Sequence, residues 1–212
     1  VLMGTKGMIR SCISPSAQVA KCVRVTYDTT VLLDDMSNGG GIACDIENAL
    51  RMNADCMAVQ TFIGTPGESR SLELLCRTAD AGTRYGIPTL GVVAVGKQME
   101  RTEKFFQLAT RVLAENGANV VKSYFCEGFE RVAAACPVPI VIAGGKKLPE
   151  LDALEMAYQA IDQGAHGVDM GRNIFQSDCP AGMAQAIGKV VHEGYTAKQA
   201  YEVYQEVKNQ NA

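Results

Sequence analysis

One lysine lies in the middle of an apolar, β-rich segment and is the residue best placed for covalent chemistry. The segment reads VVKSYF over residues 120–125, and strand alternation puts Lys122 and Tyr124 on the same face. Burial among apolar side chains penalises the charged form of an amine, and the free amine can form a Schiff base with a carbonyl. The sequence therefore predicts a nucleophilic Lys122. The alternative for Lys122 is a side chain that reaches solvent from the edge of a strand. For Tyr124 two roles stay open, proton transfer and packing.

Two glycine-containing segments further along the chain could bind an anion. Gly144 and Gly145 directly follow the apolar run VIA, and paired glycines let backbone N–H groups approach an anion closely. Gly171 and Arg172 follow another β-rich run and open a short helix, which supplies N–H donors and a guanidinium. Each segment alone could be a plain turn. The two together predict a phosphate site.

The elements that must position these residues alternate regularly between strand and helix. The β-rich segments are apolar on both faces, which is typical of parallel strands covered by helices. They span residues 1–4, 23–27, 56–63, 89–95, 119–125, 139–144 and 167–171. Helical spacing of apolar residues fills most of the intervals, over residues 46–52, 72–84, 103–115, 150–163, 181–193 and 197–208.

This alternation predicts a (β/α)8 TIM barrel, and we expect residues 1–212 to form a single domain. No Gly-x-Gly-x-x-Gly follows the first strand, which speaks against a dinucleotide-binding sheet. Seven strands are visible where a barrel needs eight, so we expect the first N-terminal strand to be lacking, upstream of Val1. Such barrels bind phosphate in the loops after their last two strands, where both glycine segments lie.

Composition narrows the class of protein. With 212 residues, 47% hydrophobic residues and a net charge of −3, the chain is predicted to be globular and not to bind nucleic acid. The apolar run at residues 138–143 is far shorter than the roughly 20 residues of a membrane span. Eight cysteines without a CxxC pair indicate reduced thiols in a cytoplasmic protein, and two histidines outside any Cys/His cluster predict no metal site.

Three segments together resemble one known family. VVKSYF, CPVPIVIAGGKK and GVDMGRNIFQS, at residues 120–125, 136–147 and 167–177, are similar to the class I aldolase family that includes archaeal-type fructose-bisphosphate aldolase. The similarity is closest to the thiolase branch that acts on 3-hydroxy-2,4-pentadione 5-phosphate in autoinducer-2 catabolism. It extends over essentially the whole chain and is densest from Lys122 to Ser177.

The resemblance implies an acyltransferase. Lys122 would form the Schiff base, and Gly144, Gly145, Gly171 and Arg172 would hold the phosphate of the substrate. An acetyl group would pass to coenzyme A as co-substrate, giving acetyl-CoA and dihydroxyacetone phosphate with no tightly bound cofactor. The resemblance also implies a homo-oligomer, since decamers built from two pentamers are common in the family.

Two departures from the family pattern bear on this interpretation. Aldolase members carry a Trp and a Tyr on the strand before the lysine strand, and the Tyr is their acid/base. Here that strand reads LGVVAVGK, and we expect Val93 and Val95 at those positions. Family members also begin with a strand that ends in an Asp-His-Gly type motif, whereas the first strand here looks like their second. The valines favour the thiolase over the aldolase.

Two other functions stay open. The chain could be a Schiff-base aldolase that cleaves a ketose phosphate, which an assay with and without coenzyme A would distinguish. It could also be a barrel fragment that binds sugar phosphates without turning them over, in which case ligand would stabilise the protein and no product would form.

Overall fold

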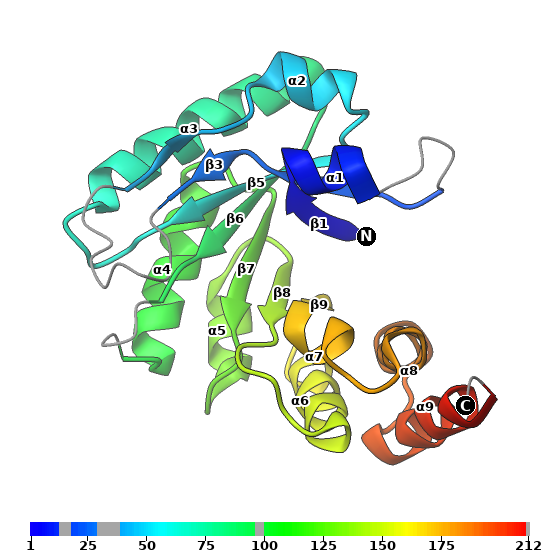
Figure 1. Ribbon diagram of the computed structural model, residues 1–212. Coiled ribbons are helices and arrows are strands. Elements are labelled where there is room, and N and C mark those ends of the chain that lie inside the picture. The colour runs from blue at the N-terminus through cyan, green and yellow to red at the C-terminus, as the bar shows by residue number, and fades with distance from the viewer. Residues whose placement is uncertain (13–17, 29–38, 96–99, 211–212) are drawn as a thin grey trace.

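Most of the strands form one curled parallel sheet, as predicted. The computed structural model describes residues 1–12, 18–28, 39–95 and 100–210 (Figure 1). Within these residues seven parallel strands pair in the order of the chain, and helices cover the outer face. The strands are β1 (Leu2–Thr5), β2 (Lys21–Arg24), β5 (Cys56–Thr61), β6 (Thr89–Val93), β7 (Val120–Tyr124), β8 (Ile140–Ala143) and β9 (Gly167–Asp169). The fold is therefore a partial (β/α) barrel, and β1 and β9 are the edge strands of the described sheet.

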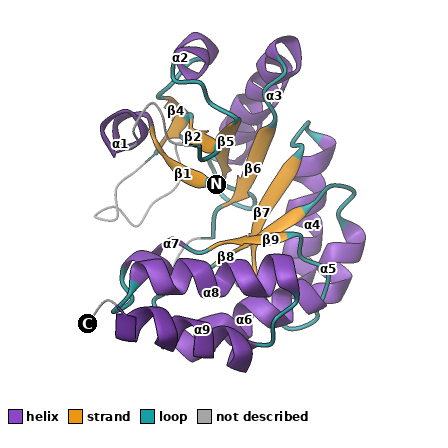
Figure 2. Ribbon diagram, turned by 90° about the vertical axis from the view of Figure 1, so that its right-hand side faces the viewer, coloured by secondary structure: helices purple, strands orange, loops and turns teal. Residues whose placement is uncertain are grey.

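All six helices predicted over the intervals are present. The helices are α1 (Lys6–Cys12), α2 (Ile46–Arg51), α3 (Glu68–Tyr85), α4 (Glu103–Glu115), α5 (Phe129–Ala135), α6 (Glu150–Asp162), α7 (Gly171–Phe175), α8 (Pro180–Glu193) and α9 (Ala197–Gln210). The sequence did not predict α1 and α5, because two turns carry too little periodicity to recognise. Figure 2 shows α8 and α9 alongside α6, on which both pack. Of the described helices, none has the length and apolar character needed to cross a bilayer.

One predicted strand is divided in two. The segment predicted at residues 23–27 leaves the large sheet after β2, and its end forms β3 (Thr26–Tyr27), which pairs antiparallel with β4 (Gly41–Ile42). The side chain of Thr26 explains the break. Its Oγ1 accepts the backbone N–H of Gln60 at 3.1 Å, in place of a main-chain ladder bond between β2 and β5. Sequence alternation alone does not reveal such a change of partner.

Alternation along the strands separates two cores. Outward-facing residues such as Val23, Val121 and Ile142 are fully buried between the sheet and the helices. Inward-facing residues, including Cys22 and Leu90, form a second cluster inside the barrel. This inner cluster fills the amino-terminal half of the barrel. Polar residues that point inward at the carboxyl ends of the strands therefore lie above an apolar floor.

Two helical glycines provide a test of the packing between α3 and the sheet. A Cβ on Gly82 would overlap the carbonyl oxygen of Ile87, whereas a Cβ on Gly188 in α8 would meet nothing within 4 Å. We expect Gly82→Ala to lower the free energy of unfolding by about 1–3 kcal/mol, because the backbone of Ile87 cannot move freely. Gly188→Ala should raise it by about 0.5–1 kcal/mol through helix propensity.

Urea denaturation of both variants measures the two effects against the same reference. Equal effects of the same sign would contradict the packing described for Gly82.

Candidate functional site

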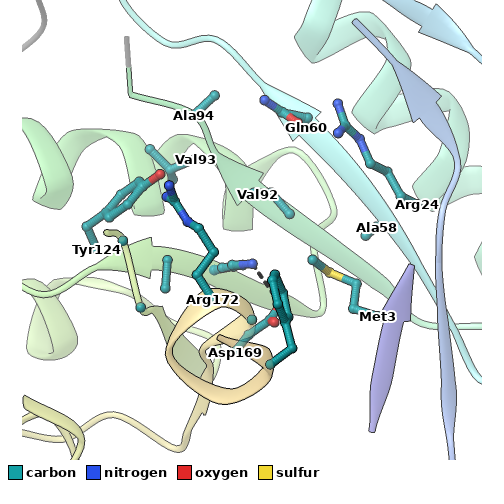
Figure 3. A pocket seen from close by; sticks show the side chains of 16 residues that line it. Met3, Arg24, Ala58, Gln60, Val92, Val93, Ala94, Tyr124, Asp169 and Arg172 are labelled. Atoms are coloured by element: carbon teal, nitrogen blue, oxygen red, sulfur yellow. Dashed lines mark ion pairs between the residues drawn. The ribbon is translucent and has the colours of Figure 1, made fainter. Parts of the chain in front are cut away.

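All six residues predicted for the site line one cavity. The cavity has a volume of about 560 Å³ and lies at the carboxyl ends of the strands (Figure 3). Its lining includes the predicted nucleophile, its neighbour on the strand and the predicted phosphate-binding residues: Lys122, Tyr124, Gly144, Gly145, Gly171 and Arg172. The structure thus brings these segments together around one cavity, and the role of each residue is a separate question.

Lys122 is paired with a carboxylate. Its Nζ lies 2.8 Å from Oδ2 of Asp169, the pair marked by the dashed line in Figure 3. The two side chains are 14% and 25% exposed, so the pair is largely shielded from solvent. The prediction of a wholly apolar setting for Lys122 was wrong in this respect. Asp169 was not among the residues predicted for the site.

Curvature of the sheet brings this pair together. Lys122 on β7 is in register with Val141 on β8, which is in register with Gly167 on β9. Asp169 is therefore two strands away, a distance of roughly 10 Å in a flat sheet, and two residues nearer the carboxyl end. Only small or short side chains, those of Val141 and Ala143, lie between them on the inner face of β8. The inward curl and these short side chains let the amine reach the carboxylate.

Tyr124 lies on the same face as Lys122, as predicted, and lines the cavity. The guanidinium of Arg101 lies 4.4 Å from the centre of the Tyr124 ring, and the ring also packs against Phe106 at 6.2 Å between centroids. These contacts fix the orientation of the ring. They leave both of the predicted roles, packing and proton transfer, compatible with the geometry.

The two glycine loops are joined by an asparagine that the sequence analysis did not single out. Asn173 on α7 is fully buried; its Nδ2 donates to the carbonyl of Gly144 at 2.9 Å, and its Oδ1 accepts the N–H of Leu148 at 2.8 Å. A Cβ on Gly144 would lie 2.7 Å from that Nδ2, and Gly145 has a positive φ of 64°. The first glycine is therefore needed for close packing and the second for its backbone conformation.

The strand before the lysine strand borders the cavity with Val92, Val93 and, just after the strand, Ala94. Val93 and Val95 are 1% and 8% exposed and belong to the core under the helices, and of the two only Val93 also borders the cavity. The inward residues of β6 and the segment after it are Val92 and Ala94. Val92 is in register with Lys122, which fixes this alternation. The side chains of Val92, Val93 and Ala94 are all apolar, so β6 presents no acid or base to the cavity.

Two further polar side chains enter the cavity from β2 and β5. Arg24 and Gln60 both line it, and Figure 3 shows them together on the wall opposite Arg172. Burial lowers the pKa of Arg24 from its ordinary value, and the nearby charge of Asp28 opposes that shift. An arginine inside an apolar strand is the same signal that identified Lys122. Because burying a charged side chain is costly, a charged residue within an apolar strand indicates a functional site, and this criterion would have identified Arg24.

The described cysteine side chains are free thiols and lie outside the predicted chemistry. Cys126 does not line the cavity, and burial raises its pKa, so it is not an activated nucleophile. In the inner cluster, a hydrogen bond with Cys56 raises the pKa of Cys22. Among the residues that the structure describes, no group of three or more His, Cys, Asp or Glu side chains could hold a metal ion.

The chain is similar to known proteins in sequence and in fold. A profile of the DeoC/LacD family aldolases matches residues 13–177. An uncharacterized aldolase of Pasteurella multocida is 51% identical over 96% of this chain and 70% of its own length. The 3-hydroxy-5-phosphonooxypentane-2,4-dione thiolase of an Enterobacter species is 52% identical over 98% of this chain and 70% of its own. An archaeal fructose-1,6-bisphosphate aldolase structure shares the fold, with a TM-score of 0.81 and 21% identity over 89% of this chain and 77% of that chain.

Removing the asparagine that joins the two loops should weaken anion binding. Asn173→Ala leaves a buried carbonyl and a part-buried N–H without partners, so we expect a loss of about 1–3 kcal/mol in the free energy of unfolding. Affinity for inorganic phosphate, measured by calorimetry, should fall as well, because the loops are no longer held in one arrangement. An unchanged phosphate affinity in a destabilised Asn173→Ala protein would show that Asn173 supports the fold and not the anion site.

Proposed function

The chain belongs to the DeoC/LacD family of aldolases, and we propose that it is a Schiff-base thiolase of that family. It transfers the acetyl group of 3-hydroxy-2,4-pentadione 5-phosphate to coenzyme A, giving acetyl-CoA and dihydroxyacetone phosphate. The observation that carries this proposal is the Lys122–Asp169 pair inside a cavity that also contains both glycine loops. The choice of substrate is supported by the thiolase name of relatives about half identical to the chain.

The phosphate occupies the wall formed by Gly144, Gly145, Gly171 and Arg172. A guanidinium binds phosphate through charge-assisted hydrogen bonds, and glycine backbone can approach it without a side chain in the way. Phosphate binding fixes the neighbouring ketone, C4 of the substrate, beside Lys122. Such positioning can replace several kcal/mol of the entropic part of the barrier.

Lys122 attacks C4, and Asp169 handles the protons. As an ion pair the amine is protonated, so it must release a proton before it can act as a nucleophile. Oδ2 of Asp169, 2.8 Å away, is in position to accept that proton. The protonated carboxyl can then return it to the C4 hydroxyl of the carbinolamine, which leaves as water. The product of this step is an iminium between Lys122 and C4, and Tyr124 lies on the same face as a second proton carrier.

The iminium makes cleavage of the next carbon–carbon bond possible. The sulfur of coenzyme A forms a bond to the acetyl carbon C2, and the C2–C3 bond breaks. The electron pair of that bond moves to C3 and into the iminium, which becomes a neutral enamine. One proton is lost by the thiol and one is taken up at C3, after which water releases dihydroxyacetone phosphate and free Lys122.

The apolar inner face of β6 favours this reaction over simple aldol cleavage. Val92 and Ala94 offer no proton-transfer group at the positions that face Lys122. In acetyl transfer the attacking group is the thiol, so β6 needs no acid or base. We propose that coenzyme A is a co-substrate, that no cofactor is tightly bound, and that the enzyme acts as a homo-oligomer in the cytoplasm, where its phosphorylated substrate is retained during autoinducer-2 catabolism.

An assay of acetyl-CoA formation from the phosphorylated dione tests the proposal. The wild-type chain should form acetyl-CoA only when coenzyme A is present. Lys122→Arg should form none, because arginine keeps the positive charge beside Asp169 and cannot form the imine. Asp169→Asn should lower kcat by about 10²-fold or more, the usual contribution of a positioned acid/base.

Two results would contradict the proposal. Cleavage at an equal rate without coenzyme A would make the chain an aldolase. Thermal stabilisation by the substrate with no product at all would make it a binding protein.

A further inference from the structure

Arg24 and Gln60 form a polar wall that the chemistry described so far does not use. Both line the cavity, on the side opposite Arg172 (Figure 3). The Nε atom of Arg24 is buried and has no hydrogen-bond partner among the residues that the structure describes. A buried guanidinium nitrogen without a partner is costly, so a ligand atom that accepts a hydrogen bond there would be favoured.

The register of the strands places this wall beside the reactive lysine. Lys122 on β7 is in register with Val92 on β6, which is in register with Gln60 on β5. Gln60 is therefore on the same level of the barrel as Lys122, about 10 Å away along the sheet before side chains extend inward. Arg24 on β2 is in register with Ala58, one inward position below Gln60. Both polar groups thus border the space in front of the amine.

The ends of these strands are fixed by hydrogen bonds. The backbone N–H of Gln60 donates to Oγ1 of Thr26 at 3.1 Å, and the N–H of Val25 donates to the carbonyl of Ala58 at 2.9 Å. Val25 and Ala58 are each 1% exposed. The backbone that carries Arg24 and Gln60 is therefore rigid. Donors on a rigid backbone cost little reorganisation when charge develops next to them.

The substrate of the proposed function, bound with its phosphate at Arg172, would present its acetyl group to this wall. Its phosphate is on C5, next to the C4 carbonyl that Lys122 attacks, and is held by the opposite wall. The acetyl carbonyl C2 lies two bonds beyond C4, on the side away from the phosphate. With the phosphate on Arg172 and C4 at Lys122, the acetyl group would extend toward the wall of Arg24 and Gln60.

We propose that Arg24 and Gln60 are catalytic residues that polarise the acetyl carbonyl and stabilise the oxyanion formed when the thiol of coenzyme A attacks it. This inference rests on the proposed function. As the carbon–sulfur bond forms, the π pair of the C2 carbonyl moves onto its oxygen. The guanidinium and the side-chain amide donate hydrogen bonds to that oxygen. When the carbonyl re-forms, the C2–C3 bond breaks and its electron pair passes to C3 and the iminium at C4.

The chemistry of the two groups suits this role. A guanidinium keeps its charge in a partly buried site and presents several donors in a fixed plane. A side-chain amide adds a neutral donor. Removing one donor from such a site typically lowers kcat by about 10²–10³-fold. The group they stabilise exists only during acetyl transfer, so they are not needed for imine formation.

The test separates acetyl transfer from imine formation. For Arg24→Met we expect kcat for acetyl-CoA formation to fall by about 10²-fold or more. Borohydride trapping with dihydroxyacetone phosphate should stay within about twofold of wild type, because that ligand has the phosphate and the reactive ketone but no acetyl group. Arg111→Met, which removes an exposed arginine paired with Glu115 on α4, is the matched control and should match wild type in both assays.

Gln60→Leu provides a second variant should Arg24→Met fail to fold. It should lower kcat by about tenfold or more and leave trapping of dihydroxyacetone phosphate unchanged. An unchanged kcat in the folded variants, or an equal loss of trapping and acetyl transfer, would overturn the inference. If the wild-type chain itself traps no ligand on Lys122, the proposed function fails. That result differs from failure of this inference alone, in which the wild-type chain still traps ligand.

Discussion

The pair formed by Lys122 and Asp169 is the interaction on which the rest of the site depends. It joins β7 to β9 across an intervening strand and can form only because the sheet curls. A buried amine without a partner would be costly, and the carboxylate offsets that cost while remaining a proton acceptor. One contact therefore keeps the lysine inside the barrel and holds it next to the group that can take its proton. The inner apolar cluster below limits the access of water from that side.

The other polar groups of the cavity are arranged around this pair on two walls. The glycine loops and Arg172 face one side, and their geometry is maintained by Asn173, which links α7 to the loop after β8. Arg24 and Gln60 face the other, at strand ends whose backbone is fixed through Thr26. A ligand with an anion at one end and a carbonyl at the other would span the cavity with its central ketone at the lysine.

The sequence predicts the elements and the end of the barrel where the site residues gather, but not the individual side-chain contacts between distant elements. Lys122 and the glycine loops could be found because each signal lies within one short segment. Asp169 could not be recognised as the partner of Lys122, since strand curvature brings together residues 47 positions apart. The inward face of β6 could not be read from the sequence, because an apolar strand such as LGVVAV carries no alternation of polar and apolar residues. The strand before Thr26 ends where the Thr26 side chain accepts a hydrogen bond from the backbone of Gln60, and the spacing of residues in the sequence does not reveal such a contact.

The most direct test of the account is to identify the residue that carries the trapped substrate. The chain is incubated with 3-hydroxy-2,4-pentadione 5-phosphate, reduced with borohydride, digested and examined by peptide mass spectrometry. We predict a single adduct, on the peptide that contains Lys122. The Lys122→Arg variant, which keeps a positive charge beside Asp169, should carry no adduct on that peptide. An adduct on the adjacent loop lysines Lys146 or Lys147, or no adduct with active enzyme, would contradict the central claim.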